Sequence, residues 1–163
     1  MKVRIIITGG TFDKEYDEIQ GKLYFNKTHM NDILTLGRSR LPVILEPLMM
    51  VDSLDMRPSD REKILKQCKD SKEDKIIITH GTDTMNETAK VLAEGGLGKT
   101  IVLTGAMIPY AFGTSDGLFN IGGALAFAQC LDPGVYIAMN GRYFEWDRVK
   151  KNKETGIFEV KKQ

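Results

Sequence analysis

Five short runs of mainly β-branched, apolar residues recur along the chain, and segments with helical features lie between them. The runs cover residues 3–7, 43–45, 75–79, 100–104 and 135–139. Because they are nearly continuous in apolar residues rather than alternating, they are typical of strands covered on both faces. Strand alternating with helix predicts an α/β fold, a three-layer sandwich with a doubly wound, largely parallel, Rossmann-like sheet and right-handed connections.

Four helices are predicted from capping residues and from the spacing of apolar side chains. They are expected over residues 29–36, from Pro58 onward, over 84–94 and over 116–130. The last of these is apolar around much of its surface, so we expect it to be sandwiched between other elements. After Met139 the pattern becomes polar with interspersed aromatic residues, which predicts a hairpin or an arm.

Length and charge restrict the class of protein. A chain of 163 residues with 42% hydrophobic and 28% charged residues is typical of one globular domain, so we expect residues 1–163 to form a single domain. Its 23 basic and 22 acidic residues give a net charge of +1, which offers no attraction for nucleic acid or for an anionic membrane. The apolar runs are far shorter than the roughly 20 residues of a membrane span.

The N-terminus and the cysteines bear on the cellular compartment. Met1 and Lys2 lead directly into the first apolar run, without the pattern of a signal peptide. Cys68 and Cys130 both fall in predicted helices, and we interpret them as reduced core thiols rather than as a disulfide or a metal pair. We therefore expect a cytoplasmic protein.

The segments that follow the predicted strands carry most of the reactive side chains. In parallel α/β sheets, ligands bind beyond the carboxyl ends of the strands. The segments there are rich in glycine, hydroxyl and carboxylate groups, and they cover residues 8–13, 52–56, 80–85 and 105–109. Paired glycines allow close approach of the backbone, and exposed N–H groups can hold an anionic oxygen. This composition predicts a polar binding site at one edge of the sheet.

Each of these features also has a simpler structural interpretation. Gly9 and Gly10 could form only a tight corner after a strand. Thr82 or Asp83 could be only the cap of the following helix. The basic residues 150–153 could be a solvated turn.

No cofactor is predicted. His80 is interpreted as a hydrogen-bonded loop histidine, and His29 is remote from it in sequence, so the two do not form a metal-binding set. The sequence Gly9-Gly10-Thr11 lacks the spaced third glycine of a nucleotide-binding fingerprint.

Two motifs, each directly after a predicted strand, carry a resemblance to a known family. Residues 8–11 read TGGT and residues 80–85 read HGTDTM. Together they resemble the two signature motifs of the L-asparaginase family, the bacterial-type amidohydrolases that include the glutaminase-asparaginases. Residues 103–109, 115–120, 139–140 and 148–151 extend the resemblance over nearly the whole chain. The resemblance corresponds to the larger N-terminal domain of the family, and we expect no C-terminal domain here.

The resemblance implies an L-asparagine amidohydrolase that releases aspartate and ammonia without a cofactor. Thr11 would attack the side-chain carboxamide carbon and form an acyl-enzyme. Thr82, Asp83 and Lys151 correspond to the family's second catalytic cluster, and Asp83 would also bind the substrate's α-ammonium group. Backbone N–H groups near Thr82 and from the Gly10 loop would stabilise the oxyanion.

The resemblance also implies a substrate-binding set. Ser53 corresponds to the serine that contacts the α-carboxylate, and Ala106 lies where the leaving amide is held. Leu54 departs from the family because many members have a polar residue there, so Asp52 is an alternative contact to the substrate. The predicted set comprises Gly10, Asp52, Ser53, Leu54, Gly81 and Ala106.

A catalytic tyrosine is expected on the segment that follows Thr11. We expect residues 11–23 to form a loop that is mobile when the site is empty and that closes with Tyr16 beside Thr11. Tyr24 is the alternative, although its position next to Phe25 favours a packing role.

Two further expectations concern function and assembly. The alternative function is a non-catalytic amino-acid-binding module with the same pocket, but the presence of two candidate hydroxyl nucleophiles favours the enzyme. We expect a homo-oligomer, a dimer or a tetramer, because a neighbour's smaller domain partly closes the family's pocket. The aromatic residues 142–146 are a candidate interface, and the alternative is a hairpin packed on its own sheet.

Overall fold

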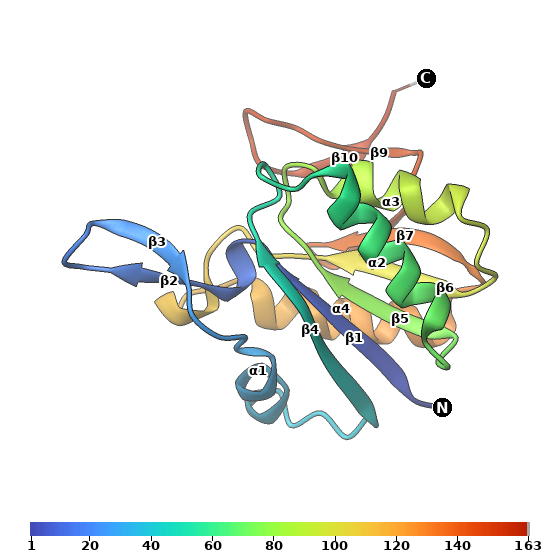
Figure 1. Ribbon diagram of the computed structural model, residues 1–163, viewed down its shortest axis with the longest axis horizontal. Helices are drawn as coiled ribbons and strands as arrows, with labels where there is room; N and C mark the ends of the chain where they lie inside the picture. The colour runs from blue at the N-terminus through green and yellow to red at the C-terminus, as the bar shows by residue number, and fades with distance from the viewer. Residues whose placement is uncertain (163) are drawn as a thin grey trace.

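A six-stranded sheet forms the middle layer of the molecule in the computed structural model, which describes residues 1–162 (Figure 1). The strand order is β4-β1-β5-β6-β7-β8. Five strands are parallel: β1 Val3–Gly9, β4 Val43–Val51, β5 Lys75–Thr79, β6 Thr100–Thr104 and β7 Gly134–Met139. The last strand, β8 Arg142–Glu145, pairs with β7 in the antiparallel sense. This confirms the predicted doubly wound, largely parallel sheet.

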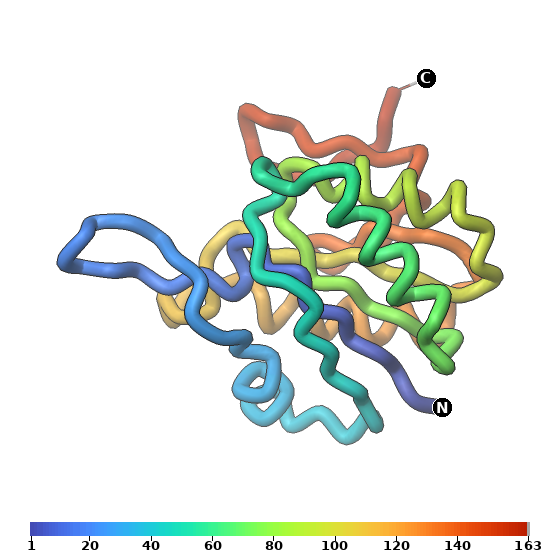
Figure 2. Tube along the Cα trace, viewed as in Figure 1, coloured from blue at the N-terminus to red at the C-terminus, as the bar shows by residue number. Residues whose placement is uncertain are grey.

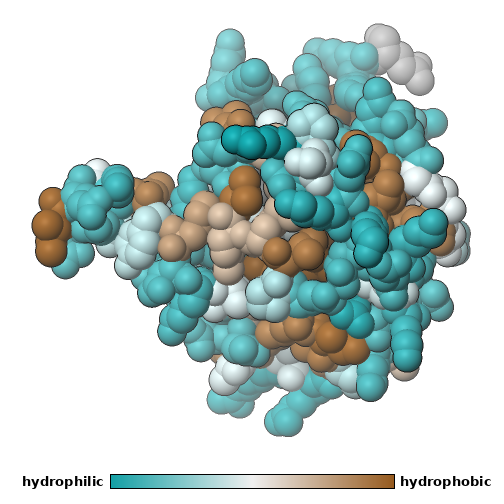
Figure 3. Space-filling view, viewed as in Figure 1, coloured by the Kyte–Doolittle hydropathy of each residue, from teal (hydrophilic) through white to brown (hydrophobic). Residues whose placement is uncertain are grey.

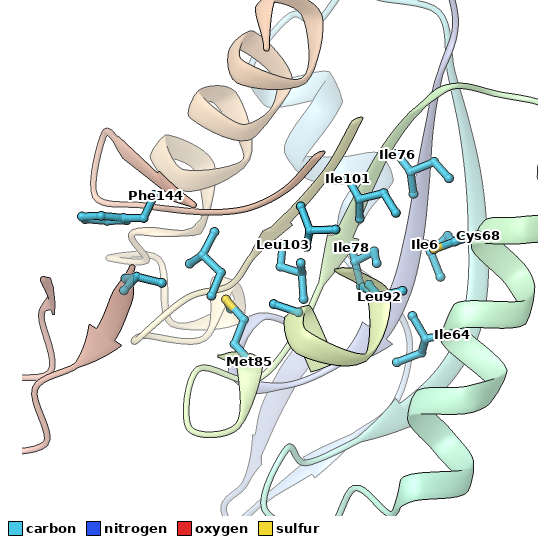
Figure 4. Packing of buried hydrophobic residues seen from close by; sticks show 14 of the residues in the cluster. Ile6, Ile64, Cys68, Ile76, Ile78, Met85, Leu92, Ile101, Leu103 and Phe144 are labelled. Atoms are coloured by element: carbon cyan, nitrogen blue, oxygen red, sulfur yellow. The ribbon is translucent and has the colours of Figure 1, made fainter. Parts of the chain in front are cut away.

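Helices cover both faces of the sheet. The helices are α1 Met30–Leu36, α2 Pro58–Asp70, α3 Met85–Glu94 and α4 Gly117–Cys130. Ile64 of α2 and Leu92 of α3 pack with Ile6 and Ile78 on one face, as Figure 4 shows. On the other face, α1 and α4 pack against the alternate side chains of the same strands, among them Ile77. The strands are continuously apolar because each of their faces meets a helix.

Helix α4 differs in one respect from the prediction. Its inner side, with Ile121, Ala124 and Ala128, is buried against the sheet. Its outer side is open, and Phe119 is 65% exposed. The expectation that α4 is sandwiched is therefore wrong for this chain, and its outer side forms one wall of an apolar groove of about 480 Å³ beside α1.

The segment after Thr11 forms a β-hairpin that projects from the body of the molecule (Figure 2). A short 3₁₀ turn, η1 Thr11–Asp13, leads into β2 Lys14–Asp17, which pairs with β3 Lys22–Phe25. The Asp17 carboxylate accepts the backbone N–H groups of Ile19 and Gln20, and these bonds shape the turn. The tip is exposed and mainly polar, and its one large apolar side chain is Ile19, which is 91% exposed. Figure 3 shows a small apolar patch among hydrophilic atoms at the projecting end. The structure thus gives this segment a regular pairing where the sequence predicts a loop.

The polar stretch after Met139 also packs on the body. Phe144 of β8 is buried in the core, and the Arg142 guanidinium lies 4.7 Å from the centroid of its ring. Trp146 is partly buried against the same core. These side chains pack on their own sheet, which confirms the hairpin interpretation of residues 142–146. Tyr143 is 48% exposed, and a role of this segment at an interface stays a prediction. A second hairpin follows, made of β9 Val149–Lys151 and β10 Phe158–Val160.

The two cysteines lie in different surroundings. Cys68 is buried in α2, and burial raises the pKa of its thiol to about 12. Cys130 ends α4 and is exposed, so the prediction of a core thiol is wrong at that position. Within residues 1–162, no helix is long and apolar enough to cross a bilayer.

Candidate active site

The carboxyl ends of the parallel strands meet through direct contacts between backbones. Gly10 follows β1 with φ +76°, and a Cβ there would overlap the backbone nitrogen of Gly81, which follows β5. A Cβ on Gly81 would in turn overlap the Ser53 side chain, which follows β4. Glycine is required because a larger residue would separate the strand ends. These contacts bring together the TGGT and HGTDTM motifs, as the topology predicts.

Three predicted site residues form one cluster. The Nζ of Lys151 in β9 donates to the Thr82 Oγ1 at 2.8 Å and to the Asp83 Oδ1 at 2.7 Å. The Lys151 side chain is only 14% exposed, whereas Asp83 is 48% exposed. Its neighbour Lys150 instead pairs with Glu159 across the β9–β10 hairpin, at 3.3 Å. The alternation of side chains along β9 separates the two lysines, so Lys151 is not part of a solvated basic turn.

The cluster is anchored from α3 and fixes the direction of the Thr82 hydroxyl. Asn86 donates from its side chain to the Val149 carbonyl at 2.7 Å, which holds β9 beside α3. Because the Thr82 oxygen accepts from Lys151, its own proton is available to another acceptor. The Met107 sulfur lies 3.6 Å from that oxygen, and sulfur is a weak acceptor. A stronger acceptor on a bound molecule would therefore compete well for this proton.

His80 is held in the interior beside the cluster. Its Nδ1 lies 2.7 Å from the Gly81 carbonyl oxygen and its Nε2 lies 2.7 Å from the Thr88 hydroxyl. Burial, helped by the charge of Arg61, lowers the pKa of His80 to about 4, against the hydrogen bond to Gly81. The ring is therefore neutral at pH 7, as expected for a hydrogen-bonded loop histidine. Residues 1–162 contain no group of three His, Cys, Asp or Glu side chains placed to hold a metal ion.

The predicted substrate-binding residues occupy different positions around the cluster. Ser53 is buried, and its carbonyl accepts the Thr84 hydroxyl at 2.7 Å. Leu54 is exposed, whereas the Ala106 side chain is buried in the core. Asp52 forms an ion pair with Lys14 of β2 and accepts the Leu54 N–H at 3.0 Å. The contact of Asp52 with Lys14 is one that sequence reasoning missed.

The candidate nucleophile and the candidate tyrosines lie along the hairpin and its root. Thr11 is half-buried at the start of η1, directly after Gly10. Tyr16 lies in β2 opposite Leu23 and is 53% exposed. The Tyr24 hydroxyl donates to Glu15 at 3.1 Å within the hairpin, and the Tyr24 side chain is 38% exposed. The catalytic role of Tyr16 stays a prediction.

Asp116 and Asn120, whose role sequence reasoning missed, bind the backbone of the segment after β6 through hydrogen bonds. The Asp116 carboxylate accepts the backbone N–H groups of Met107 and Ile108, each at 3.0 Å. The Asn120 side chain donates to the Gly105 carbonyl at 2.9 Å and accepts the Asn140 N–H at 2.9 Å. Residues 115–120 are part of the resemblance, but this role depends on contacts between β6, α4 and β7. No spacing in the sequence could have identified it.

Comparisons with known proteins identify the family of the chain. Residues 2–161 match the family model described as "Asparaginase, N-terminal". The L-asparaginase of Thermococcus kodakarensis is 31% identical over 96% of this chain and 49% of its own length. L-asparaginase 1 of Escherichia coli K12 is 33% identical over 95% of this chain and 48% of its own length.

Solved structures of L-asparaginases have a similar fold. The crystal structure of L-asparaginase I from Vibrio cholerae superimposes with a TM-score of 0.84 at 26% identity, over 98% of this chain and 51% of that one. The chain thus spans about half the length of the relatives that it matches. The signature motifs, the fold and the family match agree, and the chain belongs to the asparaginase family.

Proposed function

We propose that this chain supplies the catalytic residues of an L-asparagine amidohydrolase, which converts the side-chain carboxamide to aspartate and ammonia. The observation that carries the proposal is the contact of Lys151 with both Thr82 and Asp83, residues 69 and 68 positions away in the sequence. Relatives of this chain that are named L-asparaginases support the choice of substrate. A protein that only binds an amino acid would need the pocket, but it would not need a lysine ammonium that donates to a threonine hydroxyl.

Thr11 is the proposed nucleophile. Its hydroxyl oxygen bonds to the carboxamide carbon, and the hydroxyl proton passes to the amide nitrogen, which leaves as ammonia. Water then attacks the resulting ester, releases aspartate and returns a proton to Thr11. Backbone N–H groups near Gly10 and Thr82 hold the oxyanion of each tetrahedral intermediate. Their support is the close approach of the Gly10 and Gly81 backbones.

Thr82, Asp83 and Lys151 are proposed to assist this chemistry as a unit. The Lys151 ammonium polarises the Thr82 hydroxyl, which relays the proton to the leaving nitrogen. One oxygen of the Asp83 carboxylate accepts a hydrogen bond from Lys151. The side chain is half-exposed, so its other oxygen can accept a hydrogen bond from the substrate's α-ammonium group. Ser53 is proposed to face the α-carboxylate, and Tyr16 to approach Thr11 when the part of the hairpin beyond Glu15 bends toward the site.

Release of ammonia tests the proposal directly. Purified protein should release ammonia from L-asparagine, and a coupled assay should compare this rate with those for L-glutamine and D-asparagine. Thr11→Ala should lower kcat by several orders of magnitude with an unchanged circular dichroism spectrum, because a nucleophile is lost. Calorimetric binding of L-asparagine without ammonia release by the wild-type protein would favour the amino-acid-binding module instead.

The cytoplasmic location expected from the sequence stays a prediction, which cell fractionation tests.

A further inference from the structure

The root of the β2–β3 hairpin is fixed to the body by consecutive side chains that reach in different directions. Asp13 accepts the backbone N–H of His29, at the start of α1, at 2.9 Å. Glu15 lies with its Oε1 3.1 Å from the Nε2 of the same histidine. Lys14 lies between them in sequence and pairs instead with Asp52, directly after β4. The hairpin root is thus held between α1 and the end of β4, while its tip extends away from the body (Figure 1).

The Lys14–Asp52 pair is well defined for an ion pair near the surface. The side chains are 16% and 28% exposed, compared with 79% and 55% for the helical pair Lys66–Asp70. The Lys14 ammonium also lies 5.7 Å from the centroid of the Phe25 ring. Partial burial opposes ionisation of Asp52, but the hydrogen bonds from Lys14 and from the Leu54 N–H together lower the pKa of this carboxyl. Asp52 is therefore ionised at neutral pH.

The pair joins two segments that the proposed reaction must hold in register. Lys14 is the first residue of β2 and directly follows η1, which begins at Thr11, so a fixed Lys14 restricts the position of the threonine. Asp52 directly precedes Ser53, whose position is set by the Gly81 contact and by the Thr84 hydroxyl.

Phe12 is fully buried in a core cluster that Met50 of β4 also packs against, so the segment after Thr11 is anchored from its apolar side as well. The backbone N–H of Gly10 donates to the Val51 carbonyl at 3.1 Å and joins the two segments just before Thr11 and Asp52. The ion pair is a second connection, made by side chains just beyond that hydrogen bond.

We propose that Lys14 is a positioning residue, whose ion pair with Asp52 sets the distance between Thr11 and the Ser53 turn. A substrate bound at the turn then presents its carboxamide carbon to the threonine hydroxyl. This inference rests on the proposed hydrolysis of L-asparagine. It assigns Asp52 to the support of the site rather than to direct contact with substrate. Small misplacements of reacting groups cost on the order of 100-fold in rate. Loss of the ion pair should therefore lower the rate although neither side chain touches a reacting atom.

The experiment is a double-mutant cycle with a conservative rescue. Lys14→Met removes the cation, and Asp52→Asn removes the anion but keeps an acceptor for the Leu54 N–H. The kcat/KM for L-asparagine should fall roughly 10- to 100-fold in each single variant, mainly through kcat. The double variant should be no slower than the slower single variant, because both changes break one interaction. Lys14→Arg should restore the rate to within about threefold, since it keeps the charge.

A matched control distinguishes this role from general stabilisation of the hairpin. Lys22 is an exposed lysine of β3 on the same hairpin, and Lys22→Met should change kcat/KM by less than about twofold. Thermal unfolding of every variant separates a loss of rate from a loss of fold, and Asp52→Asn keeps the test decisive if Lys14→Met does not fold.

Three results would overturn the inference. With an active wild-type protein, a Lys14→Met rate within about twofold of wild type removes Lys14 from this role. Single-variant effects that multiply in the double variant show that Lys14 and Asp52 act independently. A wild-type protein that releases no ammonia overturns the proposed function, and the inference with it, before any variant is compared.

Discussion

Lys150 and Lys151 are adjacent in sequence, yet the structure gives them opposite surroundings. Lys151 contacts Thr82 and Asp83, whereas Lys150 is half-exposed beside Glu159. We expect Lys151→Met to lower kcat by roughly 10³-fold or more, because the developing charge at the site loses a fixed cation. Lys150→Met should stay within about twofold of wild type, as for an exposed ion pair. Steady-state kinetics of the two variants measure these effects. Equal, mild losses of kcat at the two positions would show that residues 150–153 are only a solvated basic turn.

His80 makes a prediction about pH and stability. An unfolded chain binds a proton at a histidine near pH 6.5, but the folded protein does so at His80 only near pH 4. The unfolded state therefore holds more protons between these values, so the free energy of unfolding falls as the pH is lowered from about 6.5 to about 4. The loss assigned to His80 should reach about 3 kcal/mol.

Urea unfolding at pH 7, 5 and 4 measures this effect. In the His80→Gln variant, which cannot take up the proton, the free energy of unfolding should depend less on pH over the same window. Parallel pH profiles for the two proteins would show that the imidazole is not kept neutral by the fold.

The close contact between the ends of β1 and β5 can be tested by comparing alanine substitutions at two glycines that both have a positive φ. A Cβ at Gly10 would overlap the Gly81 backbone, whereas one at Gly21, in the hairpin turn, would meet nothing within 4 Å. We expect Gly21→Ala to cost about 1 kcal/mol of stability, from backbone strain alone. Gly10→Ala should cost about 2 kcal/mol more and should abolish turnover, because the two strand ends must separate. Chemical denaturation gives both values, and equal costs would show that the strand ends are not in close contact.

The strands were predictable where the apolar pattern was uninterrupted. The strand over residues 75–79 agrees with its prediction, whereas β4 runs from Val43 to Val51 and not only to residue 45. Glu46 and Pro47 interrupt the apolar run there. At the edge of the sheet both are tolerated, since Glu46 pairs with Arg4 and the proline lies in an edge strand.

The candidate site was predictable in composition but only partly in geometry. The motifs identified Thr82, Asp83 and Lys151, which the structure brings together. The pairing of Lys14 with Asp52 could not be predicted, because it depends on where the hairpin leaves β1. The hairpin itself was missed because none of the residues of β2 and β3 is fully buried, so neither strand has the buried apolar face that a sequence pattern would reveal.

At the scale of the whole molecule, assembly is the main open prediction. Asp83 is half-exposed, and water weakens charge interactions at an open site. The apolar groove between α1 and α4, with Phe119 at its edge, offers a surface for association. We expect activity only in a homo-oligomer, with specific activity and light-scattering mass falling together on dilution. Full specific activity in a monomeric sample would contradict this.

The place of Lys151 along the chain has a consequence for biosynthesis. Synthesis proceeds from the N-terminus, and the five parallel strands all precede β9. A nascent chain can therefore build the sheet, with Thr11, Thr82 and Asp83 already at its edge, while their cation is still inside the ribosome. The proposed active site is therefore completed only after the parallel strands have been synthesised, and a chain that stops before β9 would also lack the buried Val149 and Phe158. The same order of assembly makes the β9–β10 hairpin a natural fragment for split-enzyme complementation, in which a separately supplied peptide restores the missing ammonium group.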